Sequence, residues 1–222
     1  MEAAVVVGRP RRMARWAALG GALYVVLFVV GTIVLFSGPP AGDAAPAKVI
    51  QWYSDSGHRD RVNIGWILVG LGIFFFLWFV ATLRRAVGSV DDEGILTSVV
   101  TIGGSVYAAV AFASIAVNAG IRTMSDDTYR HQVFPELIHA ADDASYVMHA
   151  TGAAGLGAMI IALSLAFMWG AVWPKWAGWL GVAVGILAIG AIFFFTQWIF
   201  LLWILIVSIV MFLRGVPTAR AV

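Results

Sequence analysis

Long apolar runs alternate with short polar segments along the whole chain. A bilayer core of about 30 Å needs about 20 apolar residues of helix, and six runs meet this requirement within a few residues. They cover residues 16–36, 62–83, 95–120, 146–172, 176–195 and 198–213. The pattern predicts an all-α membrane protein with six transmembrane helices.

The last two runs are almost continuous in hydrophobicity. As one helix they would be close to twice the membrane thickness, because a helix rises about 1.5 Å per residue. The only polar pair between them is Thr196 and Gln197. We therefore expect the chain to break there, which leaves the sixth helix short.

The composition agrees with a lipid environment. Of 222 residues, 61% are hydrophobic and 12% are charged, and the mean hydropathy is +0.92. A soluble domain is about half apolar and about a quarter charged. The net charge of +2 is too small to suggest nucleic acid as a partner. The absence of cysteine excludes disulfides, thiol nucleophiles, iron–sulfur clusters and thiolate zinc sites.

Basic residues predict an orientation. If the N-terminus is cytoplasmic, the inner segments hold Arg9, Arg11, Arg12, Arg15, Arg84, Arg85, Lys175, Arg214 and Arg220. The outer loops then hold fewer, namely Lys48, Arg59, Arg61, Arg122 and Arg130. The positive-inside rule therefore favours both termini inside the cell, in a multi-pass protein of the plasma (inner) membrane.

The predicted organisation is one polytopic domain, 1–222. Its parts are a basic cytoplasmic N-terminus, three helical hairpins and a cytoplasmic tail. In chain order they cover 1–15, 16–90, 95–175, 176–213 and 214–222.

The first two hairpins share short sequences in the same order. LGGALYVV at 19–26 matches IGGSVYAA at 102–109, and a GLG tripeptide recurs at 70–72 and 155–157. These matches predict a duplicated two-helix hairpin. Chance similarity among abundant Gly, Ala and Leu is the alternative.

A proline-led segment precedes the second helix of each of these hairpins. Pro46 and Pro135 begin the two segments, and proline suits the first position of a helix. Val49, Ile50 and Tyr53 follow Pro46 at the spacing of one apolar helix face. We therefore expect two short amphipathic helices on the outer side. They can lie in the membrane interface or cover an outward cavity, and the sequence leaves both open.

Polar residues gather where the fourth predicted helix begins. If a helix starts at Pro135 and continues into this span, five of them share an arc of about 120°. Small residues continue the arc, so we expect the cluster to face neighbouring helices at the outer water interface. These candidate site residues are His139, Asp142, Asp143, Tyr146 and His149.

Three interpretations of this cluster stay open. It can be the solvated start of a helix, because acidic residues favour the first turns. It can hold a divalent metal such as zinc, with His139 and Asp143 as ligands and His58, His131 or His149 completing the site. It can be a pH-sensitive gate, since every histidine lies on the predicted outer side. Apart from such a metal, the sequence predicts no cofactor.

Ion-coupled transport and known catalytic motifs find little support. No charged residue lies near the middle of a predicted span, which argues against an ion-coupled carrier. Haem is disfavoured because only His149 lies inside a span, and no GxSxG nucleophile motif occurs. A facilitator stays open, with a polar path along the third helix through Ser105, Tyr107, Ser114 and Asn118.

The segment WPKWAGWLGVAVGIL at 173–187 resembles a signature of uncharacterised bacterial integral membrane proteins. Those proteins have six helices, and the fifth begins with proline, a basic residue, tryptophan and Gly-Trp-Leu-Gly. The resemblance implies a polytopic inner-membrane protein of bacteria. It implies no activity and carries over no catalytic residue.

From these observations we expect a non-catalytic protein, a small binding or accessory protein that handles a lipid or hydrophobic solute. The alternatives are a membrane-embedded metal-dependent enzyme with an outward His/Asp site, and a facilitative transporter. The expected partners are the lipid bilayer and either another membrane protein or a second copy of this chain.

Overall fold

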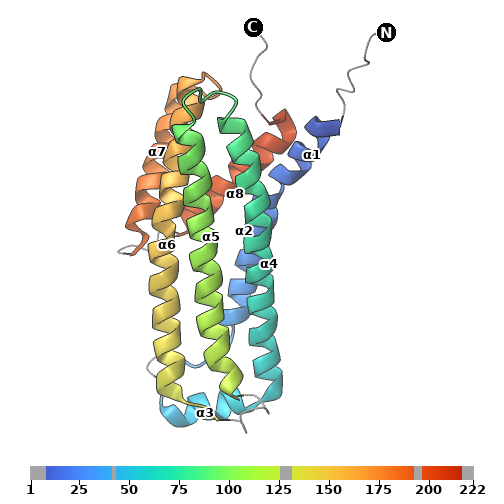
Figure 1. Cartoon of the computed structure of the whole chain (residues 1–222). Helices are drawn as coiled ribbons and strands as arrows, with labels where there is room; N and C mark the ends of the chain where they lie inside the picture. Colours follow the sequence, from blue (N-terminus) through green and yellow to red (C-terminus); the bar gives the residue numbers. More distant parts are fainter. Residues whose placement is uncertain (1–8, 42–43, 126–131, 193–196, 217–222) are drawn as a thin grey trace.

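The structure is a computed structural model that describes residues 9–41, 44–125, 132–192 and 197–216. Every regular element within these residues is helical, as predicted (Figure 1). The elements are α1 Arg9–Ala18, α2 Gly20–Phe36, α3 Pro46–Ser54, α4 Ser56–Val87, α5 Ile95–Arg122, η1 Thr123–Ser125, α6 Pro135–Trp169, α7 Lys175–Ile189, η3 Gly190–Ile192 and α8 Gln197–Arg214.

The chain is a multi-pass membrane protein by the length and apolarity of its helices. Among the described residues, five helical segments are long and apolar enough to cross a membrane: Met13–Phe36, Ser56–Val87, Ile95–Ser125, Pro135–Trp169 and Gln197–Arg214.

The remaining apolar helix, α7, has only 15 residues. Within the described residues, α7 is therefore shorter than α8, which has 18 residues, and the last residues of the predicted fifth run, 193–195, fall outside them. Of the predicted break, Thr196 falls outside the described residues and Gln197 begins α8.

The helices pack in chain order around a closed ring. α2 packs on α4, α4 on α5, α5 on α6, and α6 on α7, and α8 packs on both α7 and α2. α1 and the C-terminal end of α8 lie at one end of the bundle, here called the terminal end (Figure 1). α3 lies at the other, here called the α3 end.

Glycines let several of these helices touch backbone to backbone, as packing in lipid requires. A Cβ added to Gly103 would lie 2.4 Å from the carbonyl oxygen of Gly155. One added to Gly157 would lie 2.5 Å from the carbonyl oxygen of Gly185. These contacts hold α5 against α6 and α6 against α7, and a larger side chain at either position would push the helices apart.

α1 and α2 form one membrane helix with a local break at Leu19. The Ser208 hydroxyl of α8 donates to the Ala18 carbonyl oxygen at 2.6 Å and accepts from the Ala22 N–H at 2.9 Å. In an uninterrupted helix Ala18 and Ala22 would bond to each other. Insertion of a side chain between them explains the break.

The two predicted outer helices have different outcomes. Pro46 starts the separate helix α3, in which Val49 and Tyr53 are buried and Ile50 is exposed. Pro135 instead starts α6, which continues unbroken to Trp169. A second separate short helix is therefore not formed, because the polar segment after Pro135 belongs to the long helix.

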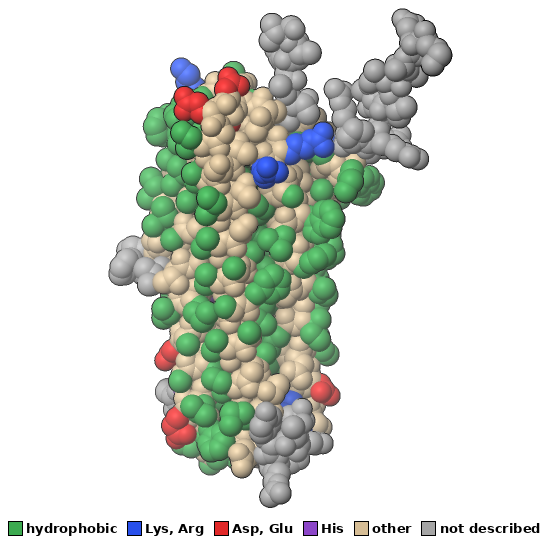
Figure 2. Space-filling model, viewed as in Figure 1, with side chains coloured by type: hydrophobic (Ala, Val, Ile, Leu, Met, Phe, Trp, Pro, Cys, Tyr) green, Lys and Arg blue, Asp and Glu red, His purple; other side chains and the backbone are tan. Residues whose placement is uncertain are grey.

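α4, α5 and α6 are longer than a bilayer core. Their 32, 28 and 35 residues cover about 48, 42 and 52 Å, against about 30 Å of hydrocarbon. Charged side chains gather near the two ends, with hydrophobic side chains between them (Figure 2). Toward the α3 end, exposed Ile64 and Val147 are followed by exposed Asp60 and Asp143. The α3 end therefore projects beyond the hydrocarbon.

Candidate functional site

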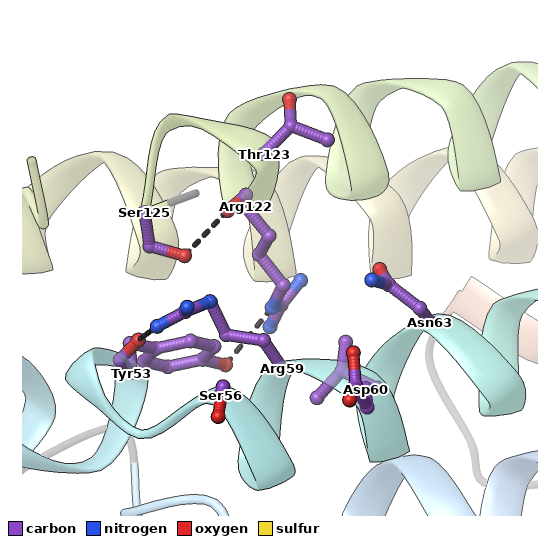
Figure 3. Close-up of a pocket in the computed structure, with 9 residues that line it drawn as sticks. Tyr53, Ser56, Arg59, Asp60, Asn63, Arg122, Thr123 and Ser125 are labelled. Carbon is purple, nitrogen blue, oxygen red and sulfur yellow. Dashed lines mark hydrogen bonds between the residues drawn. The ribbon is translucent and has the colours of Figure 1, made fainter. Parts of the chain in front are cut away.

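A polar cleft opens at the α3 end, between α3 and α4 on one side and α5 and η1 on the other (Figure 3). Its volume is about 240 Å³. The lining combines arginine, carboxylate, amide, hydroxyl and phenol groups. The residues are Tyr53, Ser56, Arg59, Asp60, Val62, Asn63, Arg122, Thr123 and Ser125, and we call this site the Arg122 cleft.

Arg122 is the last residue of α5, and its side chain is only 11% exposed. Its Nε donates a hydrogen bond to the Tyr53 hydroxyl at 2.9 Å. Its Nη2 forms an ion pair with Asp142 Oδ1 at 2.7 Å. Arg122 therefore ties α5 to both α3 and α6. Asp142 is 49% exposed, so water screens part of this ion pair.

Three buried polar atoms on α4 and α5 have no hydrogen-bond partner among the described residues. They are Arg122 Nη1, Asn118 Oδ1 and Trp66 Nε1. Asn118 lies one turn before Arg122 on α5. Trp66 lies one turn before Gly70 on α4, where an added Cβ would be 4.0 Å from Ile115 of α5. Because α4 and α5 run antiparallel, Trp66 is therefore level with Asn118, farther from the α3 end than the cleft.

Leaving such groups unsatisfied is costly. A buried donor or acceptor without a partner costs about 1–3 kcal/mol, and more when it is charged. A polar ligand that reached Arg122 Nη1 would recover part of this cost. Recovering this cost would stabilise the cleft with a ligand bound relative to the cleft without one.

α3 brings the Tyr53 phenol to the cleft. Burial raises the pKa of Tyr53 above its ordinary value, although the Arg122 charge acts in the opposite direction. The phenol is therefore protonated at neutral pH and can act as a donor. Arg59 Nη1 donates to the carbonyl oxygens of Tyr53 and Ser54, both at 3.0 Å, and so closes the end of α3.

Asp142 is a predicted site residue that adjoins the Arg122 cleft. Besides its ion pair with Arg122, its Oδ1 accepts from Asn118 Nδ2 at 2.9 Å. Asn118 Nδ2 also lies within hydrogen-bonding distance of the Ser145 hydroxyl, at 3.2 Å. Asp142 of the predicted cluster and Asn118 of the predicted polar path are thus in direct contact.

The other members of the predicted cluster lie elsewhere. His149 Nε2 is 3.4 Å from the Tyr107 hydroxyl in the bundle. Asp143 and Tyr146 are exposed, and His139 is half-buried. An arc of about 120° includes both packed and exposed faces of a helix, so sharing it does not bring five side chains to one point.

The predicted metal site has no matching group in the described residues. Nowhere in them, a set that omits His131, do three or more His, Cys, Asp or Glu side chains gather closely enough to hold a metal ion. His58 stacks on Trp52 with ring centroids 4.4 Å apart, and its Nδ1 lies 3.0 Å from the Trp52 carbonyl oxygen. A divalent metal therefore stays a prediction.

The residues of the predicted polar path on α5 lie in two different environments. Ser105 is exposed, whereas Tyr107, Ser114 and Asn118 are buried. The hydroxyls of Ser114 and Ser145 each donate to the other residue's carbonyl oxygen, at 3.0 and 3.1 Å. These two hydroxyl groups therefore join α5 to α6, and the polar path stays a prediction.

A second polar group lies in the centre of the bundle. The hydroxyls of Tyr24 and Tyr107 are hydrogen-bonded at 2.5 Å, and Tyr107 in turn contacts His149. Phe28 stacks on His149 with ring centroids 5.4 Å apart, and Phe76 packs against both tyrosines. Sequence reasoning misses Tyr24 as a candidate. The signal that could find it is the shared Gly-Gly and tyrosine spacing of 19–26 and 102–109.

Most of the Arg122 cleft is not predicted from the sequence. In the sequence Arg59 and Arg122 stand out only as loop charges, and Tyr53 only as part of an apolar helix face. Their meeting requires α3 to fold back over the end of α5, and no spacing in the chain encodes that contact.

Comparison with known proteins adds no assignment to this geometry. No protein-family model, curated protein or solved structure matches the chain.

Proposed function

We propose that this protein is a non-catalytic binding protein of the bacterial plasma membrane. It holds a lipid, or another hydrophobic solute with an acidic head, in the Arg122 cleft. The observation that carries the proposal is the Arg122 guanidinium. Arg122 lines a cleft of about 240 Å³, and its buried Nη1 has no hydrogen-bond partner among the described residues. An acidic head would supply the acceptor.

The groups around the cleft suit a phosphate or a carboxylate. Arginine is a planar, permanently charged donor whose geometry matches these anions. Ser56 and Thr123 add hydroxyl groups, and Tyr53 adds a protonated phenol. Asp60, also on the lining, can accept a hydrogen bond from an amine or hydroxyl of the same ligand.

The position of the cleft favours an amphiphile over a free solute. Asn63 lines the cleft, while Ile64 and Ile67, toward the middle of α4, are 53% and 61% exposed. A head group in the cleft would therefore leave its tail along an apolar face of α4. We place this end outside the cell, because the positive-inside rule favours cytoplasmic termini.

Binding of short-chain phosphatidic acid and of inorganic phosphate to the detergent-solubilised full chain tests the proposal. Isothermal titration calorimetry should show that Arg122→Gln weakens phosphatidic acid binding about tenfold or more, since hydrogen bonds to charged groups contribute about 1.5–3 kcal/mol. Arg61→Gln is the matched control. Arg61 is an exposed arginine near the same end that donates to the Ser37 carbonyl oxygen at 3.0 Å, and this variant should bind as the wild type does.

Because Arg122→Gln also removes an ion pair, a second variant is needed. Asn63→Trp fills the cleft while it leaves Arg122 and Asp142 in place. If Asn63→Trp binds phosphatidic acid as tightly as the wild type, the cleft is not the site. If inorganic phosphate binds as tightly as phosphatidic acid and Asn63→Trp weakens its binding, the cleft is the site but its ligand is a free anion.

A further inference from the structure

A second cavity lies toward the terminal end, between α1 and α2 on one side and α4 on the other. Its volume is about 270 Å³, and all of its lining residues are apolar. They include Trp16, Ala17, Leu23, Phe74 and Trp78. We call it the Trp78 groove.

A close contact between helices forms the floor of the groove. A Cβ added to Gly20 would lie 2.4 Å from the Phe75 carbonyl oxygen, so α2 and α4 touch backbone to backbone there. Beside this contact, Trp16 and Trp78 remain 66% and 45% exposed. Phe74 packs edge-on against Trp78 with ring centroids 6.5 Å apart. The aromatic walls and the glycine floor leave a concave apolar surface.

A stripe of exposed residues begins in the groove, follows α4 toward the terminal end and ends at an arginine. Phe74, Trp78, Ala81 and Arg85 follow one another at helical spacing, and all four are exposed. Arg85 lies in the last turn of α4, about 10 Å beyond Trp78 along the helix. Arg84, next to it, is also exposed. Positive charge therefore stands where the head group of a lipid in the groove would lie.

We propose that the Trp78 groove binds one phospholipid with an anionic head group, its acyl chain along the aromatic walls and its phosphate at Arg85. Ligand sites commonly measure about 300–1,000 Å³, so this groove suits one acyl chain better than a whole lipid. The site lies at the opposite end of the bundle from the Arg122 cleft. It goes beyond the proposed function and does not depend on it.

Bulk lipid covers any exposed apolar face, so two features together separate this site from ordinary contact. A concave surface contacts more of an acyl chain than a flat helix surface does, because more of the acyl chain's area leaves the surrounding lipid. The arginine gives selectivity, since a basic residue near a membrane surface favours anionic lipid by about fivefold.

Native mass spectrometry of the full chain in detergent measures this selectivity. We expect the wild type to retain a phosphatidylglycerol molecule about fivefold more tightly than phosphatidylcholine with the same acyl chains. Because the Arg122 cleft also favours an acidic head, the variants are compared in the Arg122→Gln background, where Arg85→Gln should remove this preference. Lys175→Gln, which changes an exposed cation at the start of α7, should keep it.

A change of shape tests the groove independently of charge. Ala17→Trp should fill the groove and weaken retention of both lipids about tenfold. Ala113→Trp, the same change on an exposed face of α5, should have no effect. If thermal unfolding shows that Ala17→Trp does not fold, Leu23→Trp takes its place.

Two results would overturn the proposal and show that the groove contacts only annular lipid, without a specific site. One is equal retention of the two lipids by the wild type, and the other is unchanged retention when the groove is filled. Arg122→Gln separates the two sites in the same assay: the lipid in the Trp78 groove should stay bound in this variant, whatever happens at the cleft.

Discussion

Tyr24 and Tyr107 occupy matching positions in the two similar segments of the chain, and their hydroxyls meet at 2.5 Å in the centre of the bundle. Both side chains are completely buried. When two copies of one unit pack around a two-fold axis, equivalent residues near the axis contact each other. This contact supports the predicted duplication of the hairpin, which stays a prediction.

The shared hydrogen bond predicts coupling between the two tyrosines. Tyr24→Phe and Tyr107→Phe should each lower the free energy of unfolding by about 1 kcal/mol, because each removes one partner of a buried bond. The double variant should lose less than the sum, since both changes remove the same bond. Reversible unfolding in mixed micelles measures all three variants. Strict additivity would show that the two hydroxyls do not interact.

Ser208 should control the shape of the first membrane helix. In Ser208→Ala nothing separates the Ala18 carbonyl from the Ala22 N–H, so the backbone can bond directly and straighten α1 and α2. Spin labels at the exposed positions Met13 and Phe36 should move apart. Ser208→Thr keeps a hydroxyl and should keep the wild-type separation. No change in Ser208→Ala would mean that the hydroxyl does not cause the break.

Two neighbouring acids on α6 should differ in their contribution to stability. Asp142→Asn weakens the contacts with Arg122 and Asn118 and should lower the free energy of unfolding by about 1 kcal/mol, because the half-exposed carboxylate is partly screened. Asp143→Asn changes an exposed side chain and should be neutral. Chemical denaturation of both variants measures the difference. Equal effects would contradict the assigned ion pair.

The contact between α5 and α6 should tolerate no added methyl group at Gly103. Gly103→Ala forces a Cβ against the Gly155 backbone and should cost about 1–3 kcal/mol. Gly120→Ala is the control on the same helix, because a Cβ there meets nothing within 4 Å. Replacing that glycine should be neutral or stabilise α5 by up to about 1 kcal/mol. Thermal unfolding in detergent measures the stability of both variants. If Gly120→Ala were less stable than Gly103→Ala, the assigned contact between α5 and α6 would be wrong.

Membrane helices could be predicted because the requirement they meet is local. Backbone groups in lipid must bond within their own helix, so a long apolar run is enough to indicate one. Helix ends were predicted less well. α6 begins at Pro135, well before the apolar run from 146, because a helix can continue into water where polar side chains are solvated.

Hydrophobic runs in the sequence were enough to predict a lipid environment, an all-helical class and most of the membrane segments. The network of Tyr53, Arg122 and Asp142 and the contact of Tyr24 with Tyr107 became known from the folded structure. These contacts depend on how each helix is rotated and where it crosses its neighbours. In lipid that choice depends on close packing at a few glycines and serines, whose meaning appears only when the facing helix is known.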